Sequence, residues 1–149
     1  MAPGKVGTET AIHFQRTYAA PRERVYQAWL EPEALKQWFG PHEDFTIPTV
    51  EVDARVGGKY RFVLVSPEGN RNTAAGTYKE ILPNEKLVFT WSWIEGGMDI
   101  GETLVTVEFR DKGNQTEVSL THELLPTEES RQAHSEGWTG TLMRLDGFL

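Results

Sequence analysis

Four histidines, His13, His42, His122 and His134, are the residues of this sequence best suited to acid–base chemistry near neutral pH. His122 shares one face of a predicted strand with aliphatic residues, so we expect it to point inward. There it could contact a ligand, act as a general base, or be hydrogen-bonded within an ordinary core. We expect His13 to face solvent on the first strand. We expect His134 and Glu136 to be solvated on the early turns of the last helix.

Other patterns that could support catalysis are weak or absent in the sequence. It contains no cysteine, which excludes thiolate metal ligands and cysteine nucleophiles, and no G-x-S-x-G motif. His42, Glu43 and Asp44 are adjacent in one predicted loop, so they neither converge on a metal ion nor form the opposed carboxylates of a glycosidase. Gly57-Gly58 lead into a strand, which favours a turn or bulge over a phosphate-binding loop. We therefore expect no catalytic residue, metal or cofactor.

Aromatic residues are concentrated on faces that are predicted to be buried, and together they could line a pocket for an apolar molecule. Ligand pockets combine apolar and aromatic walls with a few polar groups, and buried tryptophan and tyrosine need partners for their polar tips. For each residue alone, the alternative is ordinary core packing. The predicted ligand-binding residues are Trp38, Tyr60, Phe62, Tyr78, Phe89, Trp91, Trp138 and Met143 as walls, with His122 as a polar anchor.

The spacing of apolar residues predicts the elements that would position these side chains. We predict a strand over residues 11–18, short helices over 20–32 and 32–41, and a long helix over 126–149. Pro21 suits a first helical turn, Gly40-Pro41 ends the second helix, and Thr127 is a plausible N-cap of the last one.

The middle of the chain alternates with a period of two residues and is punctuated by turn residues. We predict strands over 46–56, 57–65, 73–82, 86–94, 103–110 and 116–125. The short turns between them make neighbouring strands antiparallel. The longer segment 95–102 carries three glycines and a methionine, so it is either a floppy hairpin or a gate over a cavity.

This order of elements predicts an α+β fold, in which a curved antiparallel sheet of about seven strands surrounds a long C-terminal helix. Two short helices would close one end. A curved sheet around a single helix rarely fills its own interior, so an internal cavity is a natural consequence. Gly137 and Gly140 indicate a close approach or empty space beside the sheet, because glycine within a helix costs about 1 kcal/mol relative to alanine.

Length and charge limit the class of protein further. The 149 residues suit one domain, which we place at residues 11–149 after a flexible segment at 1–10. A net charge of −7 disfavours nonspecific binding to nucleic acid or to anionic membranes. The start, MAPGKVGTET, lacks the apolar core of a signal peptide. We expect a cytoplasmic monomer, or a homodimer formed through an exposed strand edge.

The sequence resembles the START-like (SRPBCC, helix-grip, birch-pollen-allergen-like) superfamily over about residues 10 to 149. It looks closest to bacterial domains similar to the C-terminal domain of the activator of the heat-shock-protein-90 ATPase. The matching blocks are APRERVYQAWLEPEALKQWFGP (20–41), VEVDARVGGKYRF (50–62), GTYKEILPNEKLVFTW (76–91), TEVSLTHELL (116–125) and GWTGTLMRLDGFL (137–149). The resemblance implies a helix-grip fold in a superfamily that includes ligand carriers, cyclases, hydroxylase subunits and chaperone regulators.

The leading hypothesis is therefore binding of a small, mostly apolar molecule between the sheet and the C-terminal helix. A second hypothesis, implied by the resemblance, is a protein-interaction module, such as a stress-related partner of a chaperone. A third is an enzyme of the cyclase or hydrolase kind with His122 as its base, against which the lack of a recognisable catalytic constellation argues.

Overall fold

The computed structural model describes residues 10–149, so the expectation of a flexible segment at 1–10 concerns residues outside this range, except Thr10. The elements in chain order are β1 (Ile12–Tyr18), α2 (Arg22–Ala28), α3 (Pro32–Trp38), β2 (Thr46–Val52), β3 (Lys59–Val65), β4 (Arg71–Leu82), β5 (Lys86–Glu95), β6 (Thr103–Lys112), β7 (Gln115–Glu123) and α4 (Glu128–Phe148). The predicted order of strands and helices is confirmed.

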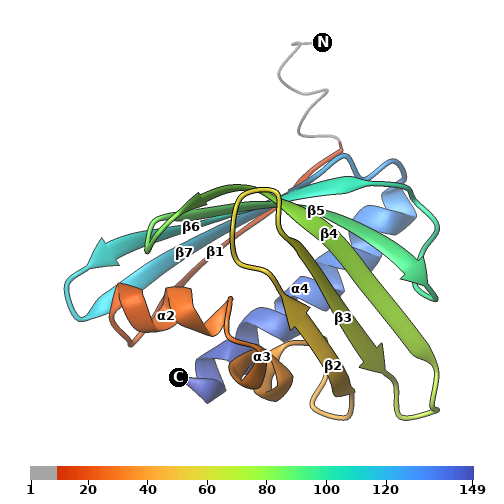
Figure 1. Cartoon of the computed structure of the whole chain (residues 1–149), viewed down its shortest axis with the longest axis horizontal. Coiled ribbons are helices and arrows are strands. Elements are labelled where there is room, and N and C mark those ends of the chain that lie inside the picture. The colour runs from red at the N-terminus through yellow and green to blue at the C-terminus, as the bar shows by residue number, and fades with distance from the viewer. Residues whose placement is uncertain (1–9) are drawn as a thin grey trace.

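Seven strands form one antiparallel sheet in the order β1-β7-β6-β5-β4-β3-β2. Strands β2 to β7 pair with their neighbours in sequence, whereas β1 pairs with β7 at the other end of the chain. Figure 1 shows the sheet curving around α4, with α2 and α3 on the same side. The α+β helix-grip architecture is therefore confirmed.

Burial along the central strands follows the predicted alternation. Leu87 and Phe89 of β5 and Val105 and Val107 of β6 are buried. Glu108, which lies between the buried Val107 and Phe109, is exposed. Because successive side chains of a strand point to opposite faces, one face of the sheet is dry and packs on the helices.

The double glycine after β2 makes the predicted sharp turn. The strand ends at Val52, earlier than the predicted residue 56, because residues 53–58 form this turn. Gly57 has a φ of 86°, and the Gly58 N–H donates to the Arg55 carbonyl at 2.8 Å. A Cβ on Gly58 would lie 2.0 Å from the Asp53 carbonyl oxygen, so only glycine fits this close approach.

Each of the two short helices buries one apolar face. Val25 of α2 and Leu35 of α3 are fully buried, and Pro32 occupies the first turn of α3. The Trp38 indole N–H donates to the Ala28 carbonyl at 3.0 Å, which satisfies an acceptor at the end of α2. These contacts fix α3, and the loop that follows it, against the end of the sheet.

Helix α4 begins with a capping box in which the Ser130 N–H donates to Thr127 Oγ1 at 3.0 Å. Its buried stripe includes Trp138, Leu142 and Leu145, as the helical spacing predicts. The Tyr18 hydroxyl donates to the Leu142 carbonyl at 2.8 Å and so ties β1 to the middle of this helix.

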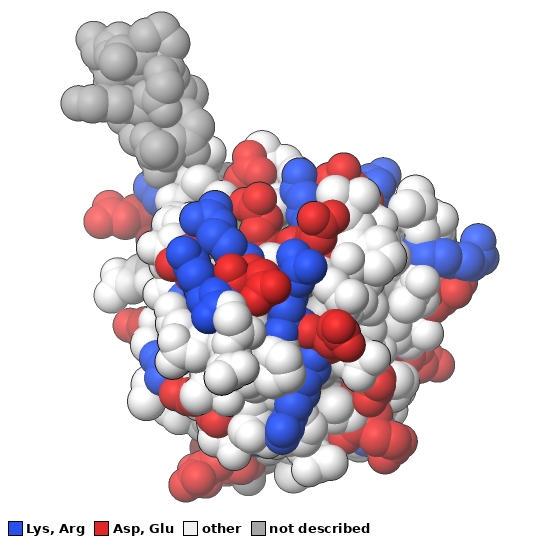
Figure 2. Space-filling view, turned by 90° about the vertical axis from the view of Figure 1, so that its left-hand side faces the viewer, with Lys and Arg blue, Asp and Glu red and all other residues white. Residues whose placement is uncertain are grey.

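Charged side chains of both signs are interspersed on the face shown in Figure 2. Several form exposed ion pairs, such as Arg61–Glu51 at 2.7 Å and Arg55–Asp53 at 2.9 Å. Exposed pairs of this kind contribute little to stability. Between residues 10 and 149, no helix is both long enough and apolar enough to cross a membrane.

Candidate ligand-binding cavity

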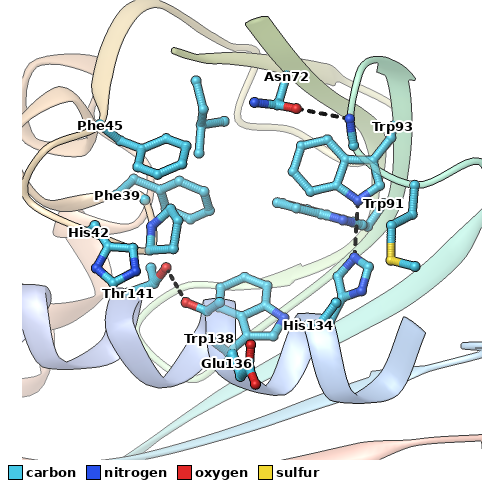
Figure 3. A pocket seen from close by; sticks show the side chains of 17 residues that line it. Phe39, His42, Phe45, Asn72, Trp91, Trp93, His134, Glu136, Trp138 and Thr141 are labelled. Atoms are coloured by element: carbon cyan, nitrogen blue, oxygen red, sulfur yellow. Dashed lines mark hydrogen bonds between the residues drawn. The ribbon is translucent and has the colours of Figure 1, made fainter. Parts of the chain in front are cut away.

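A cavity of ≈ 370 Å³ lies between α4, the loop after α3, the inner face of the sheet and the loop that joins β5 to β6. Figure 3 shows aromatic side chains around it: Phe39 and Phe45 on one side, Trp91 and Trp93 on the other, and Trp138 from the helix. The cavity therefore has the aromatic lining that the sequence predicts for a pocket, although only part of the predicted set contributes to it.

The helical side of the cavity carries a row of small residues beside His134 and Trp138. Ala133, Gly137 and Thr141 follow one another at intervals of four residues along α4 and line the cavity. A Cβ placed on Gly137 would meet no atom within 4 Å. Gly137 therefore accounts for the predicted empty space within the fold.

Gly140 serves the opposite purpose, a close approach between α4 and the loop after α3. A Cβ on Gly140 would lie 2.0 Å from the Pro41 carbonyl oxygen. One turn later, the Arg144 guanidinium donates to the carbonyls of Gln37, Phe39 and His42 at 3.0–3.1 Å. This side of the cavity is therefore held firmly against the helix, and the predicted close approach is to a loop rather than to the sheet.

The opposite side of the mouth is formed by the glycine-rich loop between β5 and β6. Gly97 and Met98 line the cavity, and Gly96 and Gly97 have φ values of 62° and 60°. The Gly97 N–H donates to Asn72 Oδ1 at 2.9 Å, which ties the loop to β4. A gating role for this loop remains a prediction.

His134 is a buried residue of the cavity wall, so the expectation that it is solvated is wrong. Its Nε2 accepts from the Trp93 indole N–H at 3.0 Å, and its Nδ1–H donates to the Ser130 carbonyl at 2.8 Å. Burial lowers the pKa of His134, and the hydrogen bond to Ser130 partly opposes this shift. The signal in the sequence was its position four residues before Trp138, on the same face of the helix.

His122 is fully buried, as expected, but it lies behind the cavity and not in its lining. The Thr103 hydroxyl donates to the Trp91 carbonyl at 2.7 Å, so it accepts the His122 Nε2–H, also at 2.7 Å. His122 Nδ1 accepts from the Trp138 indole at 3.0 Å. Burial, with a smaller effect of His134, lowers the pKa of His122 to about 3.

Protein groups engage both ring nitrogens of His122, so in this structure it presents no free polar atom to the cavity, and a direct contact with a ligand stays a prediction. The rings of His122 and His134 lie 5.0 Å apart, between the two tryptophans that they orient. The pair of neutral imidazoles thus fixes the positions of Trp93 and Trp138 on the cavity wall.

Four of the predicted wall residues, Tyr60, Phe62, Tyr78 and Phe89, pack against one another away from this cavity. The space between them and the short helices measures only ≈ 10 Å³, close to the smallest that holds one water. The structure places these four rings in the core, where Trp29, Leu35 and Phe39 fill the space opposite them, and a role in a ligand wall stays a prediction.

Trp38 and Met143 are the other predicted wall residues that do not line the cavity. Trp38 is fully buried between Trp29 and Phe39, at ring-centroid distances of 5.0 and 5.5 Å. Met143 is 57% exposed, because its position on α4 lies outside the stripe that faces the sheet. Of the nine predicted residues, Trp91 and Trp138 line the cavity.

Within residues 10–149, no group of three or more His, Cys, Asp or Glu side chains is placed to hold a metal ion. His42 lies at the cavity mouth, where its ring stacks on Phe45 at 6.3 Å.

What the arrangement can do chemically is enclose an apolar molecule between aromatic rings whose polar tips are mostly held by protein partners.

Comparisons with known proteins agree with this architecture. A search of curated proteins found no significant match. Among solved structures, protein CV1439 from Chromobacterium violaceum is 30% identical with a TM-score of 0.84, and the alignment covers 93% of this chain and 96% of that one. The AHSA1 protein from Silicibacter pomeroyi is 29% identical with a TM-score of 0.79 and coverages of 92% and 95%.

A protein from Nitrosomonas europaea, NE0264, is similar as well, at 26% identity, a TM-score of 0.79 and coverages of 95% and 94%. The family model described as "Activator of Hsp90 ATPase homolog 1-like protein" matches residues 19–149. With the seven-stranded sheet around α4, these matches place the chain in the START-like superfamily. The chain belongs to the family of proteins like the activator of Hsp90 ATPase homolog 1.

Proposed function

We propose that this protein binds a small, largely apolar molecule in the cavity between α4 and the sheet. The observation that carries the proposal is a space of ≈ 370 Å³ lined by the aromatic rings of Phe39, Phe45, Trp91, Trp93 and Trp138. Ligand pockets measure about 300–1,000 Å³ and are mostly apolar, so the size and lining fit a compact ligand.

The way α4 maintains this space also supports the proposal. Gly137 stands within a long helix, where glycine costs about 1 kcal/mol relative to alanine. No atom lies within 4 Å of the position that its Cβ would take, so packing does not demand glycine there. A requirement for open space beside the helix explains this otherwise unfavourable residue.

The test is to fill the cavity without disturbing the fold. Gly137→Leu introduces a side chain into the open space, and Gly147→Leu is the matched control, because Gly147 also lies on α4 with no atom within 4 Å of its Cβ position. N-phenylnaphthylamine, an uncharged apolar dye, serves as the probe. We expect Gly137→Leu to bind it at least about tenfold more weakly than Gly147→Leu and the wild type.

Equal affinities in the two leucine variants would contradict the proposal, as would a wild type that takes up no dye. Thermal unfolding of each variant shows whether the fold is intact, and both substitutions remove a helical glycine, which favours the helix. Native mass spectrometry of the gently purified wild type then looks for a natural ligand that the dye displaces.

A second candidate function is interaction with a chaperone, which the description of the matching family over residues 19–149 favours. The test is the ATPase rate of purified Hsp90 with and without this protein. Stimulation that survives Gly137→Leu would support a role for the outer surface. An unchanged rate at saturating protein would count against this candidate.

A further inference from the structure

The cavity provides no positive charge to a ligand. No lysine or arginine is among the residues that line it in the described part of the chain. Arg144 lies behind the loop after α3, and its guanidinium is occupied by the three main-chain carbonyls of Gln37, Phe39 and His42. An acidic group within the cavity would therefore lose its hydration without gaining a cation.

The two buried histidines do not supply a cation either. Burial is the main cause that lowers the pKa of both His122 and His134, so both rings are neutral near pH 7. Protonation would also remove the ring nitrogen that accepts a hydrogen bond from an indole, which is the indole of Trp138 for His122 and of Trp93 for His134. The geometry of the tryptophans thus depends on uncharged imidazoles.

Each polar side chain inside the cavity is already hydrogen-bonded to the protein, and Asn72 Nδ2 donates to the Asn70 carbonyl at 3.3 Å. Both nitrogens of His134 are bonded, Asn72 Oδ1 accepts from Gly97, and the Thr141 hydroxyl donates to the Gly137 carbonyl at 2.8 Å. The indole N–H of Trp91 has no partner but is itself buried, so a ligand does not reach it. The exposed lining residues His42 and Glu136 stand at the rim in contact with water.

From these observations we infer that the cavity selects compact, uncharged aromatic molecules and rejects acids of the same shape. This inference rests on the proposed function. Aromatic rings on three sides provide edge and face contacts for a flat ring system, and the lining gives a charged group nothing in return for its lost water.

The test uses two dyes that share one aromatic body. N-phenylnaphthylamine is uncharged, and anilinonaphthalene sulfonate carries the same rings with an added sulfonate. Each is titrated into the wild type and Gly137→Leu at pH 7.5, and only the binding that Gly137→Leu removes is assigned to the cavity. We expect the sulfonate to bind the cavity at least about tenfold more weakly than the neutral dye.

A substitution at the mouth tests the electrostatic cause directly. Met98 lines the cavity on the glycine-rich loop, so Met98→Lys places an ammonium group beside the entrance, and Met98→Leu is the uncharged control. We expect Met98→Lys to strengthen binding of the sulfonate by about tenfold relative to Met98→Leu, and to leave binding of the neutral dye within about twofold.

The outcomes separate the inference from the function on which it rests. Cavity binding of the sulfonate as tight as that of the neutral dye would overturn the charge selection and leave the binding function standing. Failure of both dyes to bind would overturn the binding function itself, and the inference with it. A Met98→Lys variant that improves both dyes equally would show that the ammonium does not act through charge, which also overturns the inference.

Discussion

Aromatic residues line both ends of the interior, but side chains fill one end and leave a cavity at the other. At one end, Tyr60, Phe62, Tyr78 and Phe89 meet at ring-centroid distances of 5.0–6.0 Å and leave a space of ≈ 10 Å³. At the other end, Trp91, Trp93 and Phe45 surround ≈ 370 Å³. We refer to these regions as the filled end and the hollow end.

The difference comes from the elements that face the sheet. Trp29 and Leu35 of the short-helix region project into the filled end, whereas α4 presents Ala133 and Gly137 to the hollow end beside the larger His134 and Trp138. An aromatic residue on a strand therefore becomes core or cavity wall according to the volume of the side chain opposite it.

The largest expected effect compares the same substitution at the two ends. Phe89→Ala removes a ring from close-packed surroundings, so we expect a loss of about 3–5 kcal/mol in the free energy of unfolding. Phe45→Ala removes a half-buried ring beside existing space, and we expect about 1 kcal/mol together with weaker dye binding. Chemical denaturation measures both. Similar losses at the two positions would show that the ends do not differ in packing.

The two glycines of α4 give the next largest effect. Gly140→Ala forces a Cβ onto the Pro41 carbonyl, and we expect it to destabilise the fold by about 1–3 kcal/mol. Gly137→Ala enters open space and gains helix propensity, so we expect it to stabilise by up to about 1 kcal/mol. Thermal unfolding distinguishes them by the sign of the change. A stabilised Gly140→Ala would contradict the close approach.

His122, which lies behind the hollow end, makes stability depend on pH. Burial lowers the pKa of His122 from 6.5 to about 3, so the unfolded chain binds more protons than the folded protein between these pH values. Above pH 6.5 His122 does not reduce the free energy of unfolding. As the pH falls below 6.5, the free energy of unfolding decreases by about 1.4 kcal/mol per pH unit. Denaturation at pH 7, 6 and 5 measures this slope, which His122→Gln should reduce. Parallel slopes in the two proteins would remove His122 as its cause.

The smallest effect concerns the mouth of the hollow end. Asn72→Ala removes the acceptor of the Gly97 N–H, a hydrogen bond worth about 1 kcal/mol. We expect amide hydrogen exchange at residues 96–98 to accelerate about fivefold, with no change in the strands of the filled end. Faster dye association would support the gating role of this loop. Unchanged exchange would show that Asn72 does not restrain it.

The strands and helices could be predicted from the sequence because each follows from a local period of two or of 3.6 residues. The inward orientation of Trp91, Trp138 and His122 followed from the same periods. The period does not indicate how deeply a residue is buried or which side chains lie opposite it. For this reason the period predicts both Tyr60 and Trp91 as wall residues, although Tyr60 packs at the filled end and Trp91 lies at the hollow end.

The errors on α4 have a related cause. The polar early turns of α4 favour a solvated His134, although its spacing to Trp138 places it on the buried face. The apolar type of Met143 favours a wall residue, although it follows Leu142 and so points about 100° away from the stripe. In both cases the position of the residue on the helix indicates correctly whether it is buried, and its chemical type does not.

The pairing of β1 with β7 also determines when this protein can finish folding. His13 and Thr121, which face each other across these strands, are separated by 108 residues of chain. At a synthesis rate of about 5–20 residues per second, the first strand leaves the ribosome about 5–20 s before its partner. During this interval β2 to β6 can pair with their neighbours in sequence, whereas β1 must wait for β7, and that pairing closes the longest loop between any two paired strands.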